Sequence, residues 1–339
     1  MVAEVKLSII VPVYNVSPYL KACLESVCFA ADRLGAGDQG LGLRWEAEVV
    51  CVDDGSTDGS GEILDDFARR SRNLVVIHQE NAGVSAARNA GLKAVTGDWV
   101  TFVDADDCVA RNRFAVVAKI IVENPGVGLV WMRHITSVWS DDEMEKWRDA
   151  PNEPVGSLKA YRGEDARVWG YWKFAMYGWP FANFVRRDVI GDLRFADGVR
   201  MKEDVLFFLN IVRNLDFAIE ADYAGYFYRR RRGSALMSFR RTEDCLRFAK
   251  EMLALKHVPV QVISRSLGYD LIQWSEERDW SDGYDGTSCP LRALWRENLR
   301  NGKIDMRGIY PWWRLGIRAW MRWGGLGLLR LTWKLRRSI

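Results

Sequence analysis

Short runs of β-branched and apolar residues alternate with segments of helical spacing through the first part of the chain. The apolar runs lie at 7–13, 48–53, 74–78, 99–104 and 128–132, and helical spacing occurs between them at 17–30, 58–70, 84–95 and 111–123. The runs are apolar almost without interruption, which is typical of parallel strands buried on both faces. This series predicts an α/β fold with an open, mostly parallel sheet flanked by helices.

The pattern changes beyond residue 133. Residues 139–165 are polar and irregular, and residues 170–184 are rich in aromatic side chains, which we expect to form mostly core. A helix is predicted to begin at Glu203 and Asp204, and residues 243–280 have mostly helical spacing. The C-terminal part therefore predicts a helical extension of the α/β domain.

Composition and motif spacing exclude several classes of protein. The chain has 339 residues, of which 48% are apolar and 27% charged, as expected for a protein that buries a core. Its six cysteines form no CxxC pair and its three histidines no HExxH motif, so a zinc site is not expected. The N-terminal residues do not have the pattern of a secretory signal, and we expect a cytoplasmic protein.

Acidic residues follow two of the predicted strands. "DDGSTDGS" begins at Asp53, and "DADD" begins at Asp104. In open α/β sheets, ligands bind at the carboxyl ends of the strands. Asp104 and Asp106 offer hard oxygen ligands that suit Mg²⁺ or Mn²⁺, and such a metal could neutralise a departing nucleoside diphosphate.

The first acidic segment also has a structural interpretation. Ser56, Thr57 or Asp58 could cap the following helix, whereas Asp53 and Asp54 could accept hydrogen bonds from a nucleobase or ribose. The glycines have neither GxGxxG nor GxxxxGK[ST] spacing, so neither a dinucleotide fingerprint nor a Walker loop is present.

Four segments together resemble the family 2 glycosyltransferases, a large group with the GT-A fold. They are "LSIIVPVYNVSPYLKACLESV", "VVCVDDGSTDGSGEIL", "NAGVSAARNAGLKAVTGDWVTFVDADD" and "MKEDVLFFLNI", and they span roughly residues 7–212. The resemblance implies a GT-A-type domain over residues 1–235, with a donor half at 1–135 and an acceptor half at 136–235. A helical extension at 236–300 and a basic tail at 301–339 would follow.

The resemblance also implies roles for individual residues. The donor site would be lined by Pro12, Val13 and Tyr14 at the nucleobase, Asp53 and Asp54 at the base or ribose, and Asn81, Gly83 and Arg88 on the adjoining segment. Asp104 and Asp106 would hold ribose, metal and diphosphate. Asp204 would be the general base of an inverting, single-displacement transfer. Arg229 and Arg232, within "YFYRRRRGS", would grip the diphosphate.

Several of these residues have structural alternatives. Arg88 could form a salt bridge that fixes its helix. Asp204 could be a carboxylate stabilised by the dipole at a helix N-terminus. At least two of the four arginines at 229–232 could belong to a solvated basic strand.

The C-terminal tail is basic and rich in tryptophan. Residues 309–339 carry seven basic residues and no acidic one, so the rest of the chain has a net charge of 3 − 7 = −4. Arg314, Arg318 and Arg322 recur every four residues, so on a helix they would lie on one side, and the tryptophans would lie largely outside it. Basic, tryptophan-rich helices of this kind lie on membrane surfaces. A helix docked on the body through its tryptophans is the alternative. No nucleic-acid recognition motif is present, so a nucleic-acid partner is not expected.

We therefore expect a metal-assisted glycosyltransferase that uses a nucleotide sugar, with a UDP-sugar favoured. The acceptor would be a glycan or lipid-linked hydroxyl in bacterial cell-surface polysaccharide or lipopolysaccharide assembly. The enzyme would be attached peripherally to the inner face of the cell membrane. The alternatives are a sugar-nucleotide nucleotidyltransferase, which should carry a Gly-rich phosphate loop after its first strand, and a non-catalytic membrane-bound subunit with a degenerate fold.

Overall fold

The computed structural model describes residues 4–35, 44–147, 156–230, 242–277, 290–309, 317, 318 and 321. The chain forms two compact units that interleave along the sequence. The first comprises residues 1–169, 179–198 and 214–232, and the second comprises 170–178, 199–213 and 233–339.

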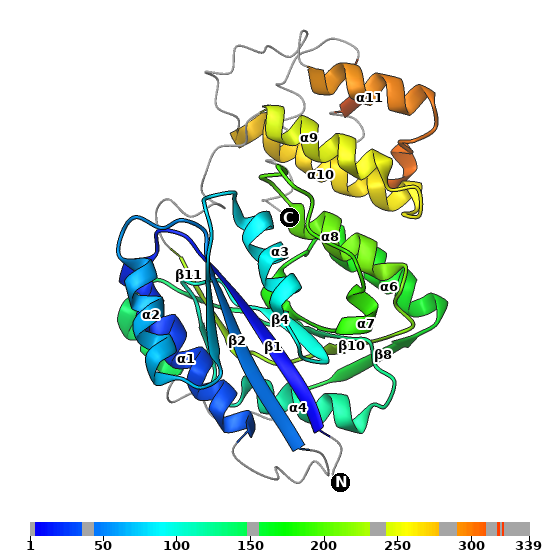
Figure 1. Ribbon diagram of the computed structural model, residues 1–339. Coiled ribbons are helices and arrows are strands. Elements are labelled where there is room, and N and C mark those ends of the chain that lie inside the picture. The colour runs from blue at the N-terminus through cyan, green and yellow to red at the C-terminus, as the bar shows by residue number, and fades with distance from the viewer. Residues whose placement is uncertain are drawn as a thin grey trace. The chain divides into compact units, whose positions relative to one another are not determined.

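An eight-stranded sheet forms the centre of the first unit (Figure 1). Its order is β3-β2-β1-β4-β9-β6-β10-β8. The strands are β1 (Glu4–Val13), β2 (Arg44–Asp53), β3 (Leu74–His78), β4 (Trp99–Phe102), β6 (Leu129–Met132), β8 (Leu158–Arg162), β9 (Asn183–Arg186) and β10 (Phe217–Ala221). Strands β3, β2, β1 and β4 are parallel, whereas β9 runs antiparallel to both β4 and β6, and β8 runs antiparallel to β10. The predicted open, mostly parallel α/β sheet is thus confirmed.

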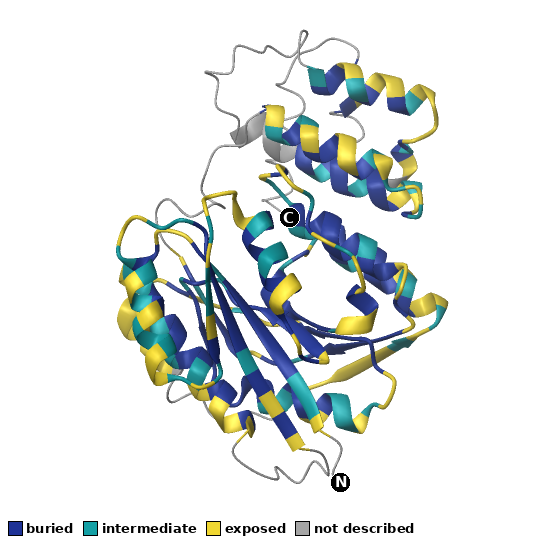
Figure 2. Cartoon of the chain, viewed as in Figure 1, coloured by how far each residue is buried: buried dark blue, intermediate teal, exposed yellow. Residues whose placement is uncertain are grey.

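Helices cover both faces of the parallel strands. The helix α1 (Ser17–Gly35) contacts α2 (Ser60–Arg70) and α4 (Arg113–Glu123), while α3 (Val84–Ala94) packs on β1 and β2 from the opposite face (Figure 1). The contact between α3 and β1 is close at Gly91, where a Cβ atom would lie 2.5 Å from Ile10 Cγ2. Figure 2 shows that the central parts of β1 and β2 are buried.

A smaller sheet of three strands also belongs to the first unit. Its order is β5-β11-β7, with β5 (Cys108–Val109), β7 (Thr136–Val138) and β11 (Tyr226–Arg229). The remaining short elements of this unit are α5 (Asp141–Met144), α7 (Arg187–Ile190) and 3-10 turns at Glu145–Trp147 and Pro180–Ala182. The chain passes from the first unit to the second within α6 (Glu164–Phe174).

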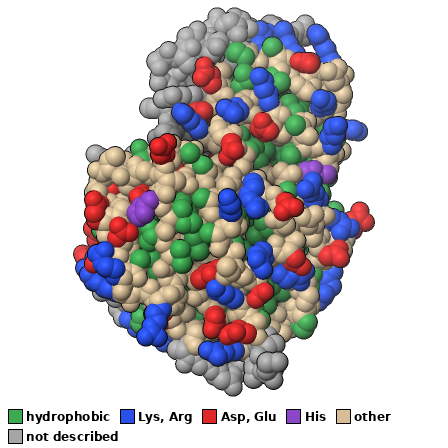
Figure 3. Space-filling model, viewed as in Figure 1, with side chains coloured by type: hydrophobic (Ala, Val, Ile, Leu, Met, Phe, Trp, Pro, Cys, Tyr) green, Lys and Arg blue, Asp and Glu red, His purple; other side chains and the backbone are tan. Residues whose placement is uncertain are grey.

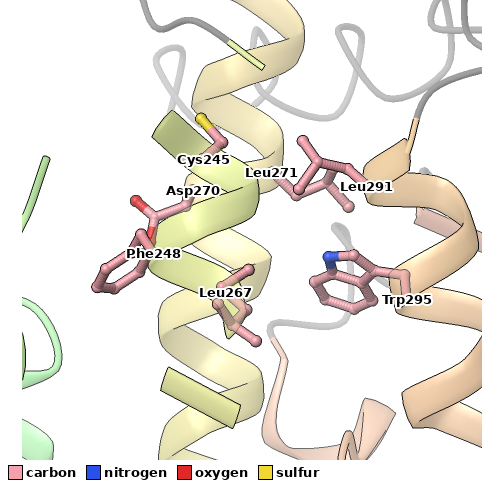
Figure 4. A pocket seen from close by; sticks show the side chains of 8 residues that line it. Cys245, Phe248, Leu267, Asp270, Leu271, Leu291 and Trp295 are labelled. Atoms are coloured by element: carbon pink, nitrogen blue, oxygen red, sulfur yellow. The ribbon is translucent and has the colours of Figure 1, made fainter. Parts of the chain in front are cut away.

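The described part of the second unit is helical. It contains α8 (Glu203–Val212), α9 (Thr242–Ala254), α10 (Val260–Glu277), α11 (Pro290–Arg300) and a 3-10 turn at Met306–Gly308. Helices α9, α10 and α11 enclose a small pocket, mostly apolar, against which Trp295 and Leu267 pack (Figure 4). Trp295 is 1% exposed, so these helices bury a core of their own.

Most of the predicted elements occur where the sequence pattern placed them. The segment at 139–165 was predicted to be irregular but contains α5 and the edge strand β8. The aromatic segment at 170–184 is mainly core, since Tyr171, Phe174, Phe181 and Phe184 are buried, although Tyr177 is 44% exposed. The domain boundaries at 235 and 300 stay a prediction.

Most of the basic tail, including Arg314 and Arg322, lies outside the described residues. Within the described ranges, no helix combines the length and apolarity needed to cross a membrane. On the face in Figure 3, lysine and arginine side chains are interspersed with aspartate and glutamate. That face therefore carries no broad surface of a single sign among the described residues.

Candidate functional site

The carboxyl ends of the parallel strands bring the predicted donor-site segments together. Val13 pairs in register with Asp53, and Asp53 pairs with His78. The main-chain nitrogen of Asp54 donates to the carbonyl oxygen of Val13 at 2.9 Å. At the end of β1, Val13 is buried, the preceding Pro12 is half-buried, and Tyr14 is 50% exposed.

Asp54 holds the loop between β3 and α3. Its Oδ1 accepts from Gln79 Nε2 at 2.7 Å and from the Ala82 amide at 2.9 Å, while its Oδ2 accepts from the Gly83 amide at 2.8 Å. The Asn81 side chain donates to the Asp54 carbonyl oxygen at 3.0 Å. Asp54 is only 2% exposed, so its carboxylate fixes the loop that carries Asn81 and Gly83.

Asp53 is linked to a histidine on the neighbouring strand. Its Oδ2 lies 2.9 Å from His78 Nδ1, and its Oδ1 accepts from the Ser56 amide at 3.0 Å. Burial alone would raise the pKa of Asp53, but the hydrogen bonds from Ser56 and His78 outweigh it and lower the pKa. His78 Nε2 also lies 3.2 Å from Asp65, and the hydrogen bonds to Asp53 and then Asp65 raise the pKa of His78.

None of Ser56, Thr57 and Asp58 takes the N-cap position of α2. The N-cap is Gly59, at φ 89°, although the neighbouring Asp58 carboxylate does accept a hydrogen bond from the amide of Ser60, the first residue of the helix. A left-handed backbone of this kind favours glycine. Asp58 instead joins the first turns of two helices, because its carboxylate accepts from the Ser60 amide at 3.0 Å and from the Ser17 amide at 2.9 Å.

The "DADD" segment alternates between accessible and buried side chains. Asp104 and Asp106 are half-buried, whereas Ala105 and Asp107 are buried. The guanidinium of Arg88 lies 3.5 Å from Asp104 Oδ1. Arg88 is only 6% exposed. It forms an ion pair, as its structural alternative predicted, and its partner Asp104 is the first predicted metal ligand.

Asp107 anchors this segment to a strand more than a hundred residues downstream. Its carboxylate accepts from the Tyr226 hydroxyl and the Arg229 amide, both at 2.7 Å. The Tyr226 hydroxyl in turn accepts from the Asp104 amide at 3.1 Å. Burial first, and then the charges of Asp104 and Asp106, raise the pKa of Asp107. Strand β11 thereby fixes the backbone that carries both predicted metal ligands.

Arg229 reaches the same segment through its side chain. Its Nε donates to the Asp106 carbonyl oxygen at 3.0 Å, and its guanidinium stacks 4.6 Å from the centre of the Tyr19 ring. It also pairs with Asp141. Arg232 lies outside the described residues.

Asp204 lies in the first turn of α8, in the second unit. Its Oδ1 accepts from the Val205 amide at 2.7 Å, and the side chain is half-buried. The dipole of α8 favours negative charge at this end of the helix. Both the helix-dipole role and the base role remain predictions for this residue.

The donor set at the strand ends fits a hard divalent cation. No group of three or more histidine, cysteine or acidic side chains that could hold a metal occurs among the described residues. Mg²⁺ and similar ions need no such group, because one or two carboxylates and the phosphates of a substrate suffice. Asp104 and Asp106 provide those two carboxylates.

Four residues that organise this edge had no predicted role: His78, Gln79, Asp107 and Tyr226. His78 is the last residue of a predicted strand next to the one that ends at Asp53, and this adjacency was the available signal. No local pattern marked the role of Tyr226, because its hydrogen-bond partners lie more than a hundred positions away in the sequence.

Comparisons with known proteins give consistent results. The family described as Glycosyl transferase family 2 matches residues 8–191. The chain is 30% identical to the uncharacterized glycosyltransferase EpsJ of Bacillus subtilis over 66% of its own length and 60% of EpsJ. It is 26% identical to the minor teichoic acid biosynthesis protein GgaA of the same organism, over 66% of the chain and 47% of GgaA. The chain thus spans less than two thirds of either relative.

Among solved structures, S. aureus TarS 1-349 in complex with UDP-GlcNAc superposes with a TM-score of 0.65 and 21% sequence identity, covering 98% of this chain and 92% of that one. At this identity the likeness concerns the fold.

Proposed function

Because the chain belongs to glycosyl transferase family 2, we propose that it transfers a sugar from a nucleotide-diphosphate donor to an acceptor hydroxyl with inversion. The observation that carries the proposal is the meeting of two acidic segments at one sheet edge. Asp53 pairs with Val13 on one side and with His78 on the other, and Asp104 follows β4, the strand on the other side of β1. Such an edge is where open α/β sheets bind nucleotides.

In this proposal the donor lies along the carboxyl ends of β1, β2 and β4. Tyr14 offers an exposed ring and Asp53 a carboxylate to the nucleoside. Asp54 acts indirectly, since it fixes the loop of Asn81 and Gly83. A UDP-sugar is the favoured donor, in keeping with the UDP-GlcNAc bound to the TarS structure.

Asp104 and Asp106 would hold Mn²⁺ or Mg²⁺. When bound, the ion would neutralise the charge that develops on the departing diphosphate. Arg88 keeps positive charge beside Asp104 at 3.5 Å, and Arg229 holds the Asp106 backbone in place. Asp204 would accept the proton of the acceptor hydroxyl as the hydroxyl oxygen attacks the anomeric carbon of the donor sugar. The C–O bond to the diphosphate breaks in the same step, which gives inversion.

The acceptor would be a glycan or lipid-linked hydroxyl in cell-surface polysaccharide assembly. The name of GgaA, a teichoic acid biosynthesis protein, supports this class of acceptor. The basic tail at 301–339 would bring the enzyme to the inner face of the membrane, because anionic lipids attract clustered arginines.

A thermal-shift screen tests the donor site. UDP, GDP, dTDP and CMP are added with and without Mn²⁺, and we expect UDP with Mn²⁺ to raise the melting temperature, because ligands stabilise the state they bind. The variant Asp106→Asn should lose the metal-dependent part of the shift. Failure of every nucleotide to shift the wild type would overturn the donor-site assignment.

Turnover is then measured as UDP release from UDP-GlcNAc, UDP-glucose and UDP-galactose, with water or poly(ribitol phosphate) as acceptor. Asp204→Asn should lower kcat by at least about 100-fold, in the range of general-base contributions. Its nucleotide shift should match the wild type. A wild type inactive on the whole panel would contradict the proposed activity.

A further inference from the structure

The helix that carries Asp204 begins at a residue with an unusual backbone. Lys202, its N-cap, has φ 57° and ψ 30°. Among the described residues other than glycine, only Asn15 shares a positive φ. A left-handed residue with a side chain is strained, and such strain persists only where the surroundings enforce it. Glycine would meet the backbone requirement more easily, so the lysine side chain needs its own explanation.

The Lys202 side chain is held inside the second unit by α10. Its Nζ lies 2.5 Å from Asp270 Oδ1, and the two side chains are 15% and 6% exposed. The ammonium also lies 5.1 Å from the centre of the Tyr269 ring and 5.7 Å from that of Phe248. Figure 4 shows Asp270 beside Phe248 at the pocket among the extension helices. Lys202 therefore joins the start of α8 to both α9 and α10.

A second contact holds the same turn through its backbone. Gly178 lies so close to α8 that an added Cβ would be 2.6 Å from the Val205 amide nitrogen and 2.9 Å from the Asp204 carbonyl carbon. Residues 203–205 are thus held by the lysine anchor on the preceding residue and by direct backbone packing. The turn has little freedom to shift or rotate.

A buried ion pair contributes little net stability, because the two charges must be taken out of water. Such a pair nevertheless fixes the positions of its two side chains relative to each other. We propose that Asp270 and Lys202 are positioning residues that set the direction of the first turn of α8 and hence the placement of the Asp204 carboxylate. This inference rests on the proposed role of Asp204. It assigns a catalytic contribution to the helical extension, which lies beyond the matched residues 8–191.

The test removes both charges together, because Asp270→Asn alone would leave a buried lysine unpaired. Lys202→Met/Asp270→Leu keeps the volume and should stay folded. We expect kcat for UDP release to fall at least about 10-fold, since small misplacements of reacting groups are costly. The KM is measured for whichever of UDP-GlcNAc, UDP-glucose and UDP-galactose the wild type turns over fastest. This KM, and the rise in melting temperature that UDP causes with Mn²⁺, should both stay within twofold of the wild-type values. Asp270→Glu retains the charge pair, so it should keep most of the kcat that the double variant loses.

Leu267→Ala is the matched control. Leu267 lies on α10 three residues before Asp270, is 2% exposed, and lines the same pocket. This variant should lower the melting temperature at least as much as the double variant and keep kcat within twofold of the wild type. Hydrogen exchange gives a readout independent of turnover. The amides of residues 206–208, which form the first hydrogen bonds within α8, should lose protection in the double variant, and much less in Leu267→Ala.

The outcomes separate the two proposals. Wild-type kcat in the double variant, together with inactive Asp204→Asn, would overturn the positioning role and leave the proposed function intact. Equal losses of kcat in Leu267→Ala and the double variant would overturn it too, since general destabilisation would then suffice. Active Asp204→Asn would remove the base itself, and the positioning role with it.

Discussion

The carboxylate of Glu48 stabilises the first unit through a dense set of hydrogen bonds. It accepts from Lys6 Nζ and Ser8 Oγ at 2.6 Å, from the Thr96 amide and hydroxyl at 2.7 and 2.8 Å, and from the Gly97 amide at 3.3 Å. These bonds join β1 and β2 to the turn that leads into β4. Burial alone would raise the pKa of Glu48, but the bonds from Lys6, Ser8 and Thr96 lower it from 4.5 to about 2.

This pKa sets the size of the expected effect. Each pKa unit corresponds to about 1.4 kcal/mol, so the carboxylate adds about 3 kcal/mol to the free energy of unfolding at neutral pH. The side chain is only 12% exposed, so solvent screening is small. Because the folded-state pKa is the lower one, this stabilisation is complete above pH 4.5 and is lost as the pH falls through about 2.

The variant Glu48→Gln tests the reasoning in urea unfolding followed by near-UV circular dichroism. Wild type and variant should differ by about 3 kcal/mol at pH 7 and by about half as much at pH 3. Glu46→Gln, on the same strand, is the control. Its side chain is 47% exposed and pairs with Arg44 at 3.7 Å, so it should change stability by less than about 0.5 kcal/mol. A difference for Glu48→Gln that is the same at both pH values would refute the reasoning.

Three further predictions concern backbone packing and the strand ends. Gly97→Ala places a Cβ 2.5 Å from Ser8 Oγ and should lower the free energy of unfolding by at least about 2 kcal/mol in urea; an unchanged midpoint would contradict this close packing. His78→Ala removes a histidine whose pKa is raised by two flanking aspartates, so its loss should destabilise most below pH 6.5 and progressively less as the pH rises through the raised pKa. A thermal-melting difference that grows with pH would have the wrong sign. Gly178→Ala, which crowds the first turn of α8, should lower kcat by a larger factor than it lowers the rise in melting temperature caused by UDP with Mn²⁺. A loss by the same factor in both measurements would argue against a local displacement of α8.

Local patterns in the sequence were sufficient for the fold class, the family and the strand-end position of the acidic segments. The apolar runs and the helical spacing between them located β1 to β4, and the match over residues 8–191 confirms the resemblance. These features depend on residues that are close together along the chain, which is why periodicity and motifs could identify them.

Long-range contacts could not be predicted in this way. The role of Asp107 depends on Tyr226, 119 positions later, and that of Lys202 depends on Asp270. Asp58 bonds the first turn of α1 as well as that of α2, and this contact depends on a helix that lies 41 positions earlier in the chain. In each case a partner from another element decides what the side chain does.

The interleaving of the two units has a consequence for synthesis on the ribosome. Strand β10 lies inside the large sheet and β11 lies between β5 and β7, yet both follow α8 in the chain. The nascent first unit cannot complete the large sheet until residue 221 has left the exit tunnel, or the small sheet until residue 229 has left it, and by then α8 has already been made. Slow, non-local pairing of this kind exposes unpaired strand edges. A chain cut at residue 191, where the family match ends, would keep Asp104 and Asp106 but lose the strand that fixes them.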